Sequence, residues 1–286
     1  MQKPLFIILL LCISAQVVFS QNAKNHVWIE TPSDTNNPAR YTDDNAIYRA
    51  GNSYVFEFQY FDKNGNERFM RYKLVPYIKP EILDNDDTSQ TTYWLPDFEF
   101  VDAFDNDSCI NRYRITVLPY APKGMFEKNY DQTVEEISYR LNGEYKTLEY
   151  SGIVENTHNI WLHPARDLLF QILELAPFPY IQFPIQRNKK WNWELTIGSH
   201  WADERWMMWE GSIKNHYRYK ITEVGRIIDT PLGELYCTVV ESSAQSRIGK
   251  TYLTAYYNDV YGFVKYDYTN IDGSRININL VEFRGK

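Results

Sequence analysis

The chain has 286 residues, of which 44% are hydrophobic and 23% are charged, so its composition is that of a folded protein. Its net charge of −7 disfavours a dedicated nucleic-acid binder, because such proteins bind phosphates mainly through cationic side chains. Aromatic residues make up 16% of the chain, which favours β-strands and large buried or stacking surfaces.

Residues 1–20 have the pattern of a secretory signal peptide. Lys3 supplies the positive start, Leu5–Ile13 is uninterrupted apolar sequence, and cleavage is expected after Ser20. Cys12 suggests lipidation as an alternative, although Leu11 is larger than the residue that lipoprotein processing requires. We therefore expect the mature chain to be exported to the periplasm or the extracellular space, with no transmembrane segment.

Alternation of apolar and polar residues predicts a series of β-strands. The first, Tyr54–Tyr60, is followed by a turn at residues 62–65 and by a second strand at Glu67–Pro76. The acidic, turn-rich residues 80–108 predict a long surface loop. Further strands are predicted at Arg112–Tyr120, Ile137–Leu141, Tyr145–Val154, Trp191–Ile197, Tyr217–Val224, Leu235–Glu241, Thr251–Tyr257, Tyr261–Tyr268 and Arg275–Phe283.

One segment, His163–Leu175, instead has helical periodicity. Its apolar stripe consists of Ala165, Leu168, Leu169, Ile172 and Leu173, and its polar face consists of Arg166, Asp167, Gln171 and Glu174. The predicted fold is therefore mainly β, a curved antiparallel sheet or half-barrel with one covering α-helix at about 163–175. We expect a single β-rich domain over residues 21–286, with a subdivision near residue 130 as the alternative.

The mature chain has two cysteines, Cys109 and Cys237. Export permits a disulfide between them, and two buried free thiols are the alternative. Neither cysteine has another cysteine or a histidine at metal-ligand spacing. The acidic runs at 84–87 and 102–107 lack the glycine and terminal glutamate of a calcium-binding loop. We therefore expect no metal and no cofactor.

Tryptophan is concentrated between residues 191 and 209, where it occurs at positions 191, 193, 201, 206 and 209. These side chains could form a platform for a glycan or an apolar ligand, or could fill the interior of the sheet. Trp206 and Trp209 would lie on opposite faces of a strand, so one of them is expected to be exposed. The candidate ligand-binding residues are Trp201, Trp206, Trp209, Glu204 and Glu210.

Glycoside hydrolysis requires two carboxyl groups placed on either side of the bond that is broken. Glu194, Glu204 and Glu210 lie among the tryptophans and are the candidates for such a pair. No local motif marks a catalytic residue. The sequence contains no G-x-S-x-G nucleophile elbow. Gly249-Lys250-Thr251 resembles the end of a phosphate-binding loop, but Ala244 stands where that loop needs its first glycine.

The second half of the chain contains the segments EYSGIVENTHNIWLHPAR at 149–166, ELAPFP at 174–179, WMMWEG at 206–211, GKT at 249–251, YGFVK at 261–265 and YTNIDGS at 268–274. Together these segments resemble a family of uncharacterised secreted β-rich proteins from Bacteroidota, over residues 140–286. The resemblance implies an exported protein with a curved antiparallel sheet and a covering helix. It implies no activity and no site residue.

These observations favour an exported, non-catalytic binding or envelope-accessory protein. Its expected partner is an apolar or glycan-like ligand, or another envelope protein, and not a nucleic acid. The alternative is an exported glycoside hydrolase that acts on polysaccharide.

Overall fold

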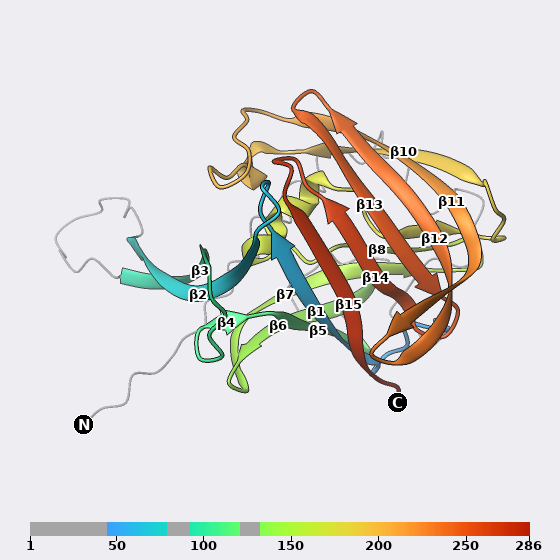
Figure 1. Cartoon of the computed structure of the whole chain (residues 1–286), viewed down its shortest axis with the longest axis horizontal. Coiled ribbons are helices and arrows are strands. Elements are labelled where there is room, and N and C mark those ends of the chain that lie inside the picture. The colour runs from blue at the N-terminus through green and yellow to red at the C-terminus, as the bar shows by residue number, and fades with distance from the viewer. Residues whose placement is uncertain (1–44, 79–91, 121–131) are drawn as a thin grey trace.

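The computed structural model describes residues 45–78, 92–120 and 132–286 (Figure 1). The predicted signal peptide at residues 1–20 and the acidic run at 84–87 lie outside the described residues. No helix in the described part of the chain has the length and apolarity needed to cross a bilayer.

The described residues form a 15-stranded antiparallel sheet that curves strongly and does not close on itself (Figure 1). The strands follow the order β10-β11-β12-β13-β14-β15-β1-β5-β6-β7-β8-β9, and β2 branches off this path to pair with β1, β3 and β4. They are β1 (Ser53–Phe61), β2 (Glu67–Ile78), β3 (Thr92–Val101), β4 (Cys109–Ile110), β5 (Arg112–Val117), β6 (Thr133–Leu141), β7 (Glu144–Glu155), β8 (Asn159–Leu162), β9 (Tyr180–Gln182), β10 (Lys190–Ile197), β11 (Ile213–Thr230), β12 (Gly233–Ser246), β13 (Gly249–Asn258), β14 (Gly262–Thr269) and β15 (Arg275–Arg284).

Alternating side chains of these strands point into the curve of the sheet. In β1 the inward face consists of Tyr54, Phe56, Phe58 and Tyr60, all of them buried. The first half of β11 shows the same period of two, because every second residue from Ile213 to Ile221 is buried. The predicted mainly β fold with a curved antiparallel sheet is therefore confirmed.

The loop predicted for residues 80–108 is wrong for its second half, which contains β3. In β3, Phe98 and Phe100 pair with Tyr72 and Met70 of β2. These apolar pairs bury Phe98 and Met70, and this burial outweighs the turn propensity of the surrounding acidic residues.

The covering helix is confirmed, but it is a 3-10 helix, η2 (Leu168–Leu175), and it begins five residues later than predicted. The backbone N–H groups of Arg166 and Asp167 donate to the carboxylate of Glu149, which holds residues 166 and 167 outside the helix. Leu168 then adopts a positive φ of 55° at the start of η2.

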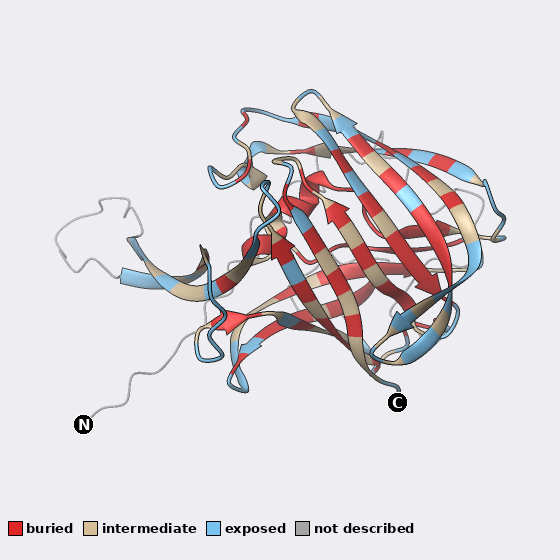
Figure 2. Ribbon diagram, in the orientation of Figure 1, coloured by how far each residue is buried: buried red, intermediate tan, exposed pale blue. Residues whose placement is uncertain are grey.

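Helix η2 fills the space inside the curve (Figure 2). The ring of Phe170 packs against Phe58 of β1, Tyr113 of β5 and Tyr139 of β6. On the opposite side, the carbonyl of Leu175 accepts hydrogen bonds from Asn215 of β11 and Thr251 of β13. Because both walls of the sheet contact η2, its predicted polar face is not fully exposed, and Glu174 is buried.

Candidate functional site

Trp191 and Trp193 belong to the core. Both lie on the inward face of β10 and are buried. The ring of Trp191 stacks on Tyr219 at 5.3 Å between centroids, and that of Trp193 stacks on Tyr217 at 4.4 Å. These two tryptophans therefore stabilise the β10–β11 pair and present no surface to a ligand.

The other three tryptophans lie between β10 and β11, in residues 198–212, which we call the tryptophan loop. It begins with the short 3-10 helix η3 (Ser199–Trp201), and Trp201 is half-buried. Trp206 and Trp209 are each only 7% exposed, so the expectation that one of them faces solvent is wrong. The loop folds back through a bridge between Asp203 and Met207 and is not a strand, so both indoles can turn inward.

The three carboxylates that the sequence singled out are exposed. Glu194 is bound by Lys214, and His216 Nδ1 lies 2.6 Å from its other oxygen. The hydrogen bond from Lys214 lowers the pKa of Glu194, which is the direction opposite to that required of a general acid. Glu204 and Glu210 lie on the tryptophan loop.

Arg205 joins the tryptophan loop to β3. Its guanidinium donates to Asp203 at 2.6 and 2.9 Å and to Asp97 of β3 at 2.8 Å. It also lies over the ring of Phe98, 4.1 Å from the centroid. The pKa of Asp203 lies below its ordinary value. Partial burial alone would raise this pKa, but the hydrogen bonds from Arg205 lower it by more. The loop and β3 are therefore held together by charge-assisted contacts.

Strands β2 and β3 form a hairpin arm that extends from the body of the sheet (Figure 1). We call residues 74–77 and 92–96 the arm tip. Its large apolar side chains are exposed, at 46% for Leu74, 40% for Tyr77, 38% for Tyr93 and 61% for Trp94. Figure 2 shows the exposed outer part of the arm. Closer to the body of the sheet, Met70 and Phe98 are buried. The sequence prediction missed this surface, because it assigned residues 80–108 to a loop.

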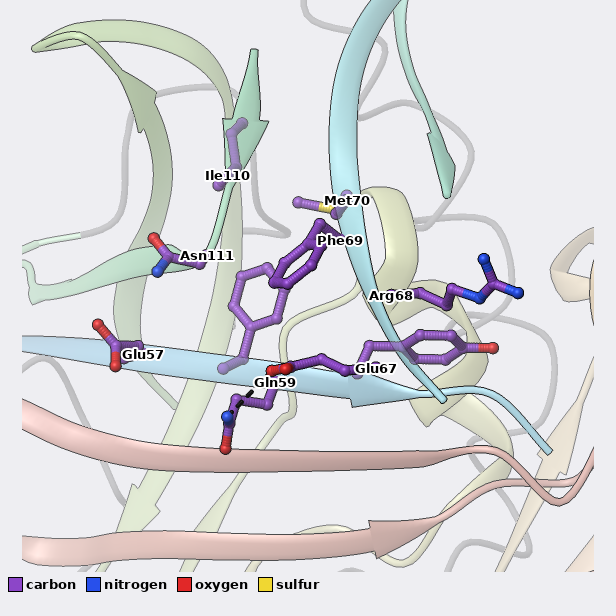
Figure 3. A pocket seen from close by; sticks show the side chains of 10 residues that line it. Glu57, Gln59, Glu67, Arg68, Phe69, Met70, Ile110 and Asn111 are labelled. Carbon is purple, nitrogen blue, oxygen red and sulfur yellow. Dashed lines mark hydrogen bonds between the residues drawn. The ribbon is translucent and has the colours of Figure 1, made fainter. Parts of the chain in front are cut away.

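A small hollow lies at the base of the arm (Figure 3). It arises because β1 pairs with β5 up to Glu57 but with β2 only from Tyr60, so the sheet forks between them. Its volume is ≈ 110 Å³, and it is lined partly by Phe69, Met70 and Ile110. This volume is well below the roughly 300 Å³ of a typical small-molecule site.

A cluster of buried titratable side chains surrounds the start of η2. Glu149 of β7 accepts hydrogen bonds from the hydroxyl of Tyr139 and from the backbone of residues 166 and 167. Burial and the neighbouring Asp167 raise the pKa of Glu149 to about 8. Burial also raises the pKa of Asp167, whose carboxylate accepts a 2.9 Å hydrogen bond from Thr147. The arrangement favours neutral carboxyl groups beside η2.

The same cluster includes Glu135, Glu174 and His163. Glu135 is fully buried, and burial raises its pKa. Burial raises the pKa of Glu174 to about 7. Burial and the nearby Arg166 lower the pKa of His163, whose neutral ring can donate from Nδ1 to the Pro164 carbonyl and accept from Arg166 at Nε2.

Perturbed carboxyl groups often mark catalytic sites, but here they lie beneath packed side chains. Glu135, Glu149 and Glu174 are 0%, 7% and 6% exposed, so a polymeric substrate could not reach them in this conformation. Part of the cluster was visible in the sequence, since Glu149, His163 and Arg166 all fall within the segment EYSGIVENTHNIWLHPAR. The inward placement of Glu135 depends on the pairing register of β6 with β7, which the neighbouring residues in the sequence do not specify.

Cys109 of β4 and Cys237 of β12 are buried free thiols, so the structure does not contain the disulfide that the sequence left open. Burial raises the pKa of Cys237 to about 11, which makes its thiol unreactive at neutral pH. Within residues 45–78, 92–120 and 132–286, no group of three His, Cys, Asp or Glu side chains is placed to hold a metal ion.

No family model matches this sequence. No curated protein matches it either. Three solved structures are similar. A protein from Bacteroides fragilis with a YmcC-like fold, thought to be exported, has 8% identity and a TM-score of 0.41 over 84% of this chain and 99% of its own. A protein from Parabacteroides distasonis, thought to be a lipoprotein, has 10% identity and a TM-score of 0.41 over 83% and 97%. The hypothetical lipoprotein YmcC from Escherichia coli has 9% identity and a TM-score of 0.29 over 80% and 86%. With TM-scores below 0.5, these similarities assign neither a family nor a function.

Proposed function

We propose that the protein is an exported, non-catalytic binding protein that holds an envelope component on its β2–β3 arm. Export is supported by the signal-peptide pattern of residues 1–20. The observation that carries the proposal is the exposure of Leu74, Tyr77, Tyr93 and Trp94 together on the arm tip. Exposed aromatic clusters of this kind are typical of interaction surfaces, whereas the inside of the sheet is occupied by η2.

The tryptophan loop forms the second part of the proposed surface, at the base of the arm. Arg205 connects the two parts through Asp97. Trp201, Glu204 and Glu210 are available at the surface of the loop, and the buried Trp206 and Trp209 support it from below. In this proposal Trp94 supplies apolar contact, and the two glutamates supply polar contact at the rim.

The proposal is tested by co-sedimentation of the mature protein with three insoluble envelope components: peptidoglycan, envelope polysaccharide and lipid vesicles. We expect at least one to bind, and we expect Trp94→Ala to weaken that binding. Tyr236→Ala is the matched control, because Tyr236 on β12 is an aromatic residue with an exposure of 68%, close to the 61% of Trp94. Binding that is unchanged in Trp94→Ala would contradict the proposal.

The same samples separate binding from glycoside hydrolysis. A binding protein releases no sugar from the polysaccharide. Glu204→Gln and Glu210→Gln should keep most of its retention on the polymer, because glutamine has the same shape and still offers a hydrogen-bonding oxygen at the rim. Sugar release that is abolished by either substitution would instead identify a hydrolase.

A further inference from the structure

The outward face of β10–β13 carries cationic and uncharged polar side chains. Alternate residues of β10 and β11 point away from the interior, because the tryptophans and tyrosines between them are buried. The strand register extends this face across β12 and β13. We call it the cationic face, and it consists of the exposed or half-exposed residues Lys190, Asn192, Glu194, Thr196, Lys214, His216, Arg218, Lys220, Glu241, Ser243, Gln245, Lys250, Tyr252 and Thr254.

The cationic face differs in charge from the chain as a whole. Its charged members are five cations and two carboxylates, namely Lys190, Lys214, Arg218, Lys220 and Lys250 against Glu194 and Glu241. The whole chain instead has 30 basic and 37 acidic residues, and its net charge is −7. A surplus of positive charge on one face of an acidic protein attracts an anionic partner to that face.

Most of these cations have no acidic partner. Lys214 is paired with Glu194. Within the described part of the chain, the other four cations of the face form no ion pair with a carboxylate. The ammonium group of Lys250 lies over the ring of Tyr252, 4.7 Å from the centroid, and this contact holds the charge at the surface. An anionic partner can therefore bind these cations without breaking an existing ion pair.

The cations stand beside neutral side chains that form hydrogen bonds. Across the sheet, Arg218 lies opposite Ser243, and Ser243 lies opposite Tyr252. In the neighbouring row, Gln245 lies opposite Lys250. Neighbouring strands are about 5 Å apart, and successive outward residues of one strand are about 7 Å apart. The cationic face therefore offers charge and hydrogen bonds side by side over an extended area.

The composition of the cationic face favours an acidic polysaccharide over other anionic partners. A protein partner or a lipid bilayer requires exposed apolar side chains, and this face contains no Val, Leu, Ile, Met, Phe or Trp. A single-stranded nucleic acid requires aromatic rings on which its bases stack, but Lys250 lies over the ring of Tyr252. An acidic polysaccharide instead requires cations for its anionic groups and polar side chains for its hydroxyl groups.

We infer that the cationic face binds an acidic polysaccharide. The anionic groups of the polymer contact Lys190 and Arg218, and its hydroxyl groups contact Ser243. This surface is separate from the arm, since Figure 1 shows β11 and β12 on the right of the molecule and β2 and β3 on the left. The inference therefore goes beyond the proposed function of the arm and does not depend on it.

The test is isothermal titration calorimetry of the mature protein with polygalacturonate, a polymer that has a carboxylate on each sugar. Fully methyl-esterified polygalacturonate is the control polymer, because it keeps the sugar chain and loses the charge. We expect the protein to bind polygalacturonate and not its methyl ester. Binding should weaken as the salt concentration is raised from about 50 to about 200 mM, because the contacts are ionic.

Three variants assign the binding to the cationic face. Lys190→Gln combined with Arg218→Gln should weaken binding by about tenfold or more. Arg49→Gln combined with Lys63→Gln removes the same charge from exposed residues elsewhere and should change binding by less than about twofold. Glu241→Gln removes a carboxylate from the face and should strengthen binding by about two- to fivefold. All three variants should unfold at the wild-type temperature, since the replaced side chains are exposed.

The outcomes decide between this inference and its alternatives. Absence of binding to polygalacturonate, or equal binding to the methyl ester, would overturn it, and so would equal weakening in the two double variants. Tighter binding to single-stranded DNA or to phosphatidylglycerol vesicles that requires Arg218 would overturn it in favour of a nucleic acid or a membrane. Trp94→Ala should leave binding to polygalacturonate unchanged, so that failure of the arm proposal and failure of this inference are observed separately.

Discussion

Replacement of Glu174 by glutamine should remove a pH dependence from the stability of the protein. Glu174 lies in η2, and burial raises its pKa from 4.5 to about 7. The folded state therefore retains a proton on this group that the unfolded chain loses between pH 4.5 and 7. The stabilisation is complete below pH 4.5, and it is lost as the pH rises through about 7. The difference in pKa corresponds to roughly 3 kcal/mol.

The assay is urea unfolding of wild type and Glu174→Gln at pH 5, 6, 7 and 8. Glutamine resembles the neutral carboxyl group, so the two proteins should be closest in stability at pH 5. Between pH 5 and pH 8, the free energy of unfolding of Glu174→Gln should rise by at most about 3 kcal/mol relative to that of wild type. Glu204→Gln, an exposed control, should stay within about 0.5 kcal/mol of wild type throughout. Parallel pH profiles for wild type and Glu174→Gln would refute the reasoning.

Three further predictions concern packing, thiols and the tryptophan loop. Leu169→Ala should cost about 2–5 kcal/mol in urea unfolding, while Gln171→Ala should cost under about 1 kcal/mol, and equal costs would mean that η2 is misoriented. Thiol titration of denatured, unreduced mature protein should find Cys109 and Cys237 both free, and no titration would show a disulfide. Arg205→Ala should lower stability by about 1–3 kcal/mol and speed proteolysis of the loop, whereas unchanged proteolysis would contradict the contact with β3.

Most strands could be predicted from the sequence because each has one face toward the interior. Alternation at Tyr54–Tyr60 and again at Trp191–Ile197 follows directly from this arrangement. Strand β3 was missed because its exposed tip lacks the contrast between a buried and a polar face. Its apolar residues occur on both faces, so the alternation that marks other strands is absent between Thr92 and Pro96.

The interior of the molecule was harder to predict, because it depends on contacts between distant segments. A helical wheel places Glu174 on the polar face of an isolated helix, but both walls of the sheet contact η2 and bury Glu174, while Gln171 on the same face stays partly exposed. The late start of η2 depends on Glu149, which lies 17 residues before Arg166 in the chain. The inward turn of Trp206 and Trp209 likewise depends on the fold of the loop, which residue spacing alone does not specify.

The central claim is that the exposed arm, and not the buried tryptophans, contacts the envelope component. Fluorine NMR of mature protein labelled with 5-fluorotryptophan tests this claim directly. Spectra are recorded with phosphatidylcholine vesicles, and with soluble fragments of peptidoglycan or envelope polysaccharide if these bind. Resonances are assigned with the Trp94→Phe, Trp206→Phe and Trp209→Phe variants. We predict that the Trp94 resonance shifts or broadens while those of Trp206 and Trp209 stay in place. A change at Trp206 or Trp209 with an unchanged Trp94 resonance would contradict the account.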